Sequence, residues 1–177
     1  MRTILIVMIV MCLTGAASSK TLEEVMKEAS VILDTDLSEI TIEAVPNLGG
    51  GAVGVACGPA LVLVDKEYWE QATDRQQLLL VVHEVLHTFG VLHSDDTAGF
   101  YFKGNYLFVP RSVMYPSTYI FDDNLLEITM LHYMLEAKYA LTTGDRRYFM
   151  VPWIYTYNKE RCLDFLNSGS SSILDIK

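Results

Sequence analysis

The sequence predicts one domain of the α+β class, because short strand-like runs lie between segments of helical periodicity. Residues 21–33 carry apolar side chains at helical spacing, and Thr21 with Glu24 forms a capping box that marks a helix start. Three runs then favour β-strands, of which the last is expected to be buried: residues 40–45, 51–57 and 60–64. At 177 residues the chain is long enough for one core and too short for two.

Helical patterns dominate the second half of the predicted domain. From Asp65 the periodicity becomes helical, and residues 78–82 are apolar without a break, which predicts a helix buried on nearly all sides. Residues 94–113 lack periodicity and are expected to form a loop region. A further helix is predicted to begin after Asp122–Asp123, which can cap it, and to end at Gly144.

The two ends of the chain differ from the predicted domain. Residues 1–19 combine one basic position, an apolar run too short to span a membrane and a stretch of small residues, which is the pattern of a secretory signal peptide. Residues 20–145 form the domain, and residues 146–177 form a C-terminal extension that is expected to pack on it, with its last residues flexible. We therefore expect a secreted protein, or a periplasmic one in a Gram-negative bacterium, without a stable membrane anchor.

Composition and charge exclude several classes of protein. Hydrophobic residues make up 51% of the chain and charged residues 20%, which is too apolar for a largely disordered protein. Thirteen Lys and Arg against 22 Asp and Glu give a formal net charge of -9. Because phosphate backbones and anionic membranes would be repelled, nucleic acid is not an expected partner. We also expect a monomer.

Two cysteines can form a disulfide in the mature chain. Removal of the leader would discard Cys12 and leave Cys57 and Cys162. In an oxidising compartment these two can pair, closing a loop of about 100 residues and stabilising the fold by roughly 4 to 5 kcal/mol on the chain-entropy account. Two separate buried thiols are the alternative, and the sequence does not decide between them.

Residues 83–93 contain three histidines at a spacing typical of a metal site. His83 and His87 lie four residues apart, so on a helix both rings share one face and can reach the same ion. His93 could not converge on that ion if the helix continued, but Gly90 can adopt a positive φ that ends the helix and turns the chain back. We therefore predict that His83, His87 and His93 bind one metal ion.

The ligand set predicts a catalytic zinc site. Three neutral imidazoles leave the fourth position of a tetrahedral Zn²⁺ open to water, unlike the ligands of a closed structural site. The ion lowers the pKa of that water toward neutrality. Glu84 follows the first ligand and can take the proton of the water and pass it to a leaving amine, which makes Glu84 the candidate general base.

The pattern His-Glu-x-x-His-x-x-Gly-x-x-His at residues 83–93 resembles the signature of the metzincin clan of zinc peptidases. In that clan a turn bearing a methionine lies beneath the metal, and Met114, within Ser-Val-Met-Tyr-Pro, stands at the corresponding place. The sequence is most similar to the matrixins, the matrix-metalloproteinase group, through residues 64–69 and the glycines at 49–51. The resemblance covers about residues 47–135.

This resemblance implies a zincin-like fold with a twisted, mainly parallel sheet, an active-site helix, the Met-turn and a C-terminal helix. Residues 20–145 would be the catalytic domain of a secreted zinc-dependent metalloendopeptidase that acts on a protein or peptide substrate. The resemblance also implies that Met114 supports the zinc site. A possible apolar substrate pocket would be bordered by Leu79, Tyr115 and Pro116.

Two features depart from related families. Residues 53–64 contain no histidine or acidic residue, so the structural zinc and the calcium ions of matrixins are not expected beside the one catalytic zinc. Astacins carry a tyrosine ligand two residues after the turn methionine, whereas this chain has Pro116 there, so Tyr115 is not counted as a ligand.

The sequence is also compatible with two functions other than a peptidase. A non-catalytic, zinc-containing secreted binding protein could keep the metzincin fold, although it would have no need of Glu84 beside the metal. A zinc hydrolase that acts on non-peptide amides would use the same ligands. His132, on the last predicted helix, is assigned no role.

Overall fold

The computed structural model describes residues 20–95, 97–102, 105–116, 122–143 and 159–167. The elements in chain order are α1 (Leu22–Leu33), β1 (Thr41–Val45), β2 (Gly54–Ala56), β3 (Leu61–Asp65), α2 (Lys66–Gln71), α3 (Asp74–Thr88), β4 (Thr97–Phe102), β5 (Asn105–Pro110), α4 (Asp123–Thr143) and α5 (Lys159–Asn167). The predicted α+β class is confirmed. The predicted signal peptide lies outside the described residues, and none of the described helices is both long and apolar enough to cross a membrane.

The strands β1, β3 and β2 form a small sheet with β3 in the middle. β1 runs parallel to β3, with Thr41 opposite Leu61, whereas β2 runs antiparallel to β3, with Val55 opposite Leu63. The prediction of a mainly parallel sheet is therefore wrong, and the sheet is mixed. The physical reason is that only residues 57–60 connect β2 to β3, which is too short for the crossover that parallel strands require.

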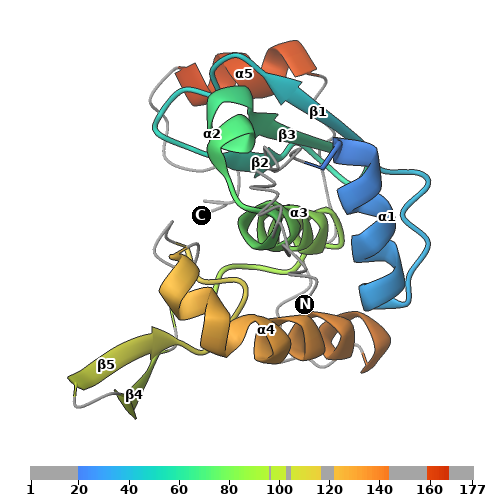
Figure 1. The fold of residues 1–177 in the computed structure, drawn as a ribbon. Helices are drawn as coiled ribbons and strands as arrows, with labels where there is room; N and C mark the ends of the chain where they lie inside the picture. Colours follow the sequence, from blue (N-terminus) through green and yellow to red (C-terminus); the bar gives the residue numbers. More distant parts are fainter. Residues whose placement is uncertain (1–19, 96, 103–104, 117–121, 144–158, 168–177) are drawn as a thin grey trace, which may run out of the picture.

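The helix α3 lies at the centre of the described structure, between the sheet and α4 (Figure 1). It also contacts α1, so other elements surround it. Every residue from Gln77 to Thr88 is buried, as the unbroken apolar run at residues 78–82 predicted. Any functional side chain on this part of α3 is therefore held in a fixed place.

Side-chain caps set the starts of the helices. The capping box predicted at Thr21 and Glu24 is present, with the Thr21 N–H donating to the Glu24 carboxylate at 2.8 Å. The helical segment predicted from Asp65 onward consists of two helices, since Asp65 caps α2, Ala72 has extended backbone and Thr73 caps α3. This break separates α2, which packs against β3, from the central α3.

The first and third predicted strands and the last predicted helix are confirmed to within one residue at their ends, whereas the second strand, predicted over residues 51–57, is shorter and begins three residues later as β2. Val62, Leu63 and Val64 of β3 are fully buried, as expected for the continuous apolar run. The helix α4 begins where the Asp122 carboxylate accepts a hydrogen bond from the Leu125 N–H at 3.0 Å.

The segment predicted as a loop at residues 94–113 contains a β-hairpin instead. β4 and β5 pair antiparallel, with Ala98 opposite Val109 and Tyr101 opposite Tyr106. Both strands are rich in aromatic and β-branched residues, which favour extended backbone even where apolar and polar residues do not alternate. The hairpin extends away from the other described elements (Figure 1).

A disulfide between Cys57 and Cys162 joins the end of β2 to α5. The sequence left open whether these cysteines pair or stay as separate buried thiols, and the structure shows the disulfide. Both cysteines are buried, in a small core with Val45, Leu48 and Leu63. The helix α5 was not predicted, and it attaches the described part of the C-terminal extension to the sheet. The aromatic part of that extension lies outside the described residues.

We expect the double substitution Cys57→Ala and Cys162→Ala to lower the free energy of unfolding by about 4 kcal/mol, because the bond spans 105 residues of chain. Denaturant unfolding of the oxidised protein, the reduced protein and the double variant measures this loss. The reduced protein and the variant should unfold at similar denaturant concentrations, below that of the oxidised protein. Coincident transitions for all three would contradict the bond.

Candidate metal centre

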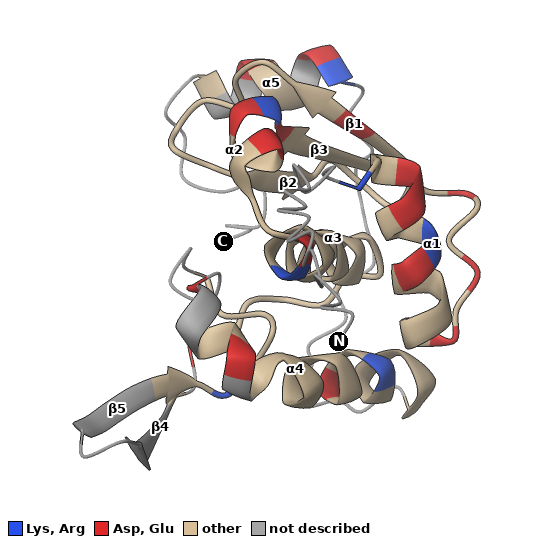
Figure 2. Ribbon diagram, viewed as in Figure 1, with Lys and Arg blue, Asp and Glu red and all other residues tan. Residues whose placement is uncertain are grey.

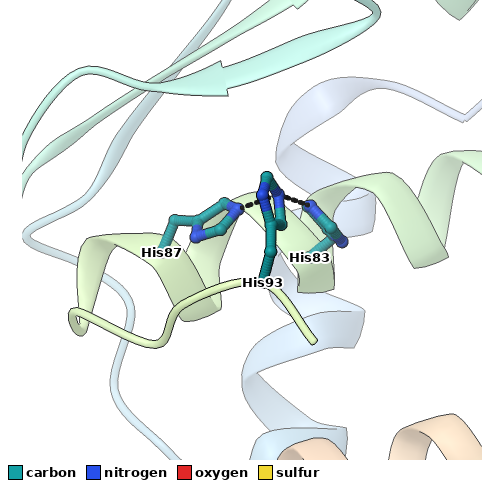
Figure 3. Close-up of side chains that lie close together, drawn as sticks. All are labelled: His83, His87 and His93. Atoms are coloured by element: carbon teal, nitrogen blue, oxygen red, sulfur yellow. Dashed lines mark hydrogen bonds between the residues drawn. The ribbon is translucent and has the colours of Figure 1, made fainter. Parts of the chain in front are cut away.

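Three histidine side chains converge near the end of α3 (Figure 3). His83 and His87 project from α3, and His93 comes from the segment that follows the helix. The Nε2 atom of His93 lies 3.0 Å from Nε2 of His87 and 3.3 Å from Nε2 of His83. His83 and His87 are buried, whereas His93 is exposed. The structure thus brings together the three histidines that the sequence predicted as ligands.

The turn that brings His93 back begins at Gly90. Its φ of 83° is a left-handed conformation that glycine adopts without strain. The Gly90 N–H donates to the His87 carbonyl at 2.8 Å. The Val91 N–H donates to the Leu86 carbonyl at 3.1 Å, which completes a Schellman cap. The conformation predicted for Gly90 is confirmed.

Hydrogen bonds on the far side of two rings fix the positions of their protons. The Nδ1 atom of His83 lies 2.7 Å from the Val113 carbonyl oxygen, and Nδ1 of His87 lies 2.7 Å from the Val91 carbonyl oxygen. A carbonyl oxygen only accepts, so each Nδ1 carries the hydrogen and each Nε2 of the neutral ring presents a lone pair. Bonds of this kind orient histidines that bind metals.

This donor set fits a metal ion. At most one hydrogen, carried by His93, can be shared among the three Nε2 atoms, whereas a cation would satisfy all three lone pairs. Nitrogens bound at about 2.0 to 2.1 Å from a tetrahedral zinc ion lie about 3.3 Å from one another. The two separations from His93, 3.0 and 3.3 Å, are close to that value, and all three donor atoms lie within 4.8 Å of one another, so His83, His87 and His93 can hold one metal ion.

Burial keeps the two inner imidazoles neutral. Loss of solvation lowers the pKa of His83 to about 4, with repulsion from His93 as the second cause. Burial, followed by repulsion from the other two histidines, holds the pKa of His87 well below its ordinary value. Because a metal binds the neutral ring, protons compete poorly with a metal ion at these two positions.

The segment around Met114 contacts the chain beside two of the three histidines. Met114 is fully buried, and its carbonyl accepts a hydrogen bond from the Ser94 N–H, next to His93, at 2.8 Å. The preceding carbonyl, that of Val113, is the one that accepts from His83. The candidate Met-turn therefore fixes backbone positions around the histidine group.

Three side chains of α4 hold that segment by its backbone. The bonds join Glu136 to the Val113 N–H at 2.8 Å, the Tyr133 hydroxyl to the Pro110 carbonyl at 2.9 Å and His132 to the Arg111 carbonyl at 2.9 Å. Sequence reasoning assigned His132 no role and missed Glu136, since helical spacing does not show which backbone group an acid will meet. Through Val113, whose N–H donates to Glu136 and whose carbonyl accepts from His83, α4 is linked to the first ligand.

Glu84 lies next to the first ligand on α3 and is buried with it. Burial raises the pKa of Glu84 to about 8, and a hydrogen bond from the Ala56 N–H of β2 opposes this rise. A cation bound beside the carboxyl group would favour its ionised form. A carboxyl group that titrates near neutral pH suits proton transfer.

The residues expected to border a substrate pocket differ in their exposure. Leu79 is fully buried in the main core. Tyr115 is half-buried against the same core, and Pro116 is exposed. In the described structure the Tyr115–Pro116 segment reaches the surface and Leu79 does not, and a pocket between them stays a prediction.

Comparison with protein-family models, with curated proteins and with solved structures finds no match to this chain. Function is therefore inferred from the residues and their geometry. These define a class of site: three histidines able to hold one metal ion, with a buried carboxyl group adjacent in the helix.

Substitution of Glu136 by alanine should weaken metal binding about 10- to 100-fold, because Val113, whose carbonyl orients His83, loses the hydrogen bond that holds its N–H. Competition with a chromophoric chelator measures the dissociation constant. Glu127→Ala, which removes an exposed acid from the same helix, is the control and should leave the constant unchanged. Equal affinities of the two variants would contradict a role for α4 in orienting the ligand.

The stability of the metal-free protein should depend on pH through Glu84. Its ordinary pKa of 4.5 applies to the unfolded chain and a pKa of about 8 to the folded one, so the folded state binds the extra proton between these values. This contribution to the free energy of unfolding therefore falls as the pH rises from about 4.5 to about 8.

Glu84→Gln removes that titration and keeps an acceptor for the Ala56 N–H. The stability of the variant relative to wild type should rise by at most about 1.4 kcal/mol per pH unit within the same window. Denaturant unfolding at several pH values in the presence of a chelator measures the difference. A difference that does not vary with pH would be incompatible with a buried, protonated Glu84.

Proposed function

We propose that this chain is a secreted zinc-dependent endopeptidase of the metzincin type. The observation that carries the proposal is the convergence of three histidine Nε2 atoms, next to a buried glutamate in the same helix. The three-histidine set is the one that catalytic zinc sites use, because it leaves one coordination position for water or substrate. Glu84 provides the carboxyl group that hydrolysis of an amide needs for proton transfer.

Zinc held by His83, His87 and His93 would act as a Lewis acid that polarises a carbonyl group and lowers the pKa of water. The chain supplies the proton transfer. Glu84 accepts the proton of the attacking water and then donates it to the leaving amine. The burial of Glu84 supports this role, because it brings the pKa of the carboxyl group toward the pH at which the protein would work.

The strand β2 offers backbone groups to an extended peptide. It is an outer strand of the described sheet. The Cys57 N–H donates to the Leu61 carbonyl of β3, so at alternate positions the backbone groups of Gly54 and Ala56 face away from β3. The Ala56 N–H reaches Glu84 from this edge. The Ala56 N–H is thus occupied, and a peptide that pairs with the remaining backbone groups of this edge would place its own backbone close to the candidate base.

Charge and the disulfide support the substrate class and the compartment in this proposal. Acidic residues lie on α1, α2 and α4 (Figure 2), and the chain has a net charge of -9. That charge favours a protein or peptide substrate over nucleic acid. The bond between Cys57 and Cys162 favours an oxidising compartment, which fits secretion.

The proposal predicts zinc-dependent cleavage of peptides that requires Glu84. Wild-type protein and Glu84→Ala are incubated with a mixed peptide library, and products are identified by mass spectrometry. We expect a chelator to abolish cleavage by the wild type and added zinc to restore it. Loss of the general base should lower kcat by about 100-fold or more while one ion stays bound.

Two further variants make this experiment decisive. His93→Ala should lose the metal ion and the activity together, whereas Glu127→Ala should keep both. Equal turnover by wild type and Glu84→Ala, or none by either, would contradict the peptidase. Bound zinc without turnover would indicate a non-catalytic binding protein, and hydrolysis confined to non-peptide amides would indicate another class of hydrolase.

A further inference from the structure

We propose that Gly54 is a positioning residue for Glu84: the absence of a side chain at the start of β2 lets the carboxyl group of the general base lie against this strand. The inference rests on the proposed peptidase function and adds a residue that lies outside the histidine pattern. It concerns the contact between β2 and α3, two elements that the structure places side by side.

The contact leaves no room for a side chain at Gly54. A methyl group on this residue would lie 2.8 Å from Oε1 and 2.9 Å from Cγ of Glu84, and 2.7 Å from Cδ1 of Leu80. Carbon atoms in contact normally lie about 3.5 to 4.0 Å apart, so each of these contacts would be an overlap. Leu80 and Glu84 lie one turn apart on α3 and are both buried. Only a hydrogen atom fits between the strand and the helix at this place.

The backbone on both sides of this contact is held in place. β2 pairs with β3 along its length, and the disulfide at Cys57 ties its end to α5. On the other side, α3 packs against α1, α4 and the sheet. The movable groups are therefore the ends of two side chains, those of Leu80 and Glu84. A methyl group at Gly54 would push the Glu84 carboxyl group away from the Ala56 N–H, whose hydrogen bond that group now accepts.

Such a shift would affect proton transfer and spare the metal ligands. The three atoms nearest to the added methyl group belong to Leu80 and Glu84, and none belongs to a histidine. A base must lie within hydrogen-bond reach of the proton that it takes. Displacement of a reacting group by about 1 Å can cost about 100-fold in rate. Gly54 thus acts on the reaction through the placement of Glu84.

The test compares Gly54→Ala with Gly50→Ala in the zinc-loaded mature protein, on a peptide that the wild type cleaves. Both variants add one methyl group. At Gly50 the φ of 60° strains alanine, but the methyl group would meet nothing within 4 Å, so this variant controls for a general loss of stability. We expect Gly54→Ala to lower kcat about 100-fold with little change in KM or zinc content, and Gly50→Ala to keep its kcat. An unchanged kcat in Gly54→Ala would overturn the inference.

A second measurement does not depend on activity. Gly54→Ala should lower the melting temperature of the metal-free protein, and this loss should shrink in the Glu84→Ala background, because the crowded carboxyl group is then absent. Equal losses in both backgrounds would show that the methyl group acts through Leu80 alone, and would overturn the inference. A wild type inactive on every peptide would overturn the peptidase and the positioning of its base together, whereas an active wild type with an unaffected Gly54→Ala would overturn this inference alone.

Discussion

Burial of α3 on nearly every side is the constraint on which the rest of the structure depends. Residues Gln77–Thr88 pack within the core, so two imidazoles and one carboxyl group occupy fixed positions in it. Removing such groups from water costs free energy unless hydrogen bonds replace the lost solvation. Backbone groups from three neighbouring segments supply those bonds, namely the carbonyls of Val113 and Val91 and the N–H of Ala56. The site is thus built mainly from helix side chains and the backbone around them.

Features that depend on residues close in sequence could be predicted from the sequence. Thr21 with Glu24 marks a helix start through contacts three residues apart. His83 and His87 share a face because helix geometry fixes positions four apart. Gly90 turns the chain because a left-handed conformation is cheap for glycine alone, and this brings His93 back to the helix. The candidate ligands were therefore predictable before any tertiary contact was known.

Features that depend on distant contacts could not be predicted in the same way. The direction of β2 is an exception, because the short connection between the predicted strands at 51–57 and 60–64 already favours antiparallel pairing, and the expectation of a mainly parallel sheet came from the family resemblance. The pairing of β4 with β5 was missed because residues 94–113 show no alternation of apolar and polar residues. The sequence offered Cys57 and Cys162 as a pair without deciding whether they bond. Glu136 and Gly54 carry no motif at all, because their roles arise from which backbone or side chain lies opposite them in space.

The unequal exposure of the three histidines has a consequence for how an ion would be loaded. His93 is the exposed member and belongs to a short segment outside the helix, while its two companions are enclosed. An ion would therefore arrive and depart on the side of the exposed His93 ring. The rings of His83 and His87 would keep their orientation during this exchange, because backbone carbonyls hold them. A protein that has lost its ion would therefore retain two of its three ligands in the binding geometry.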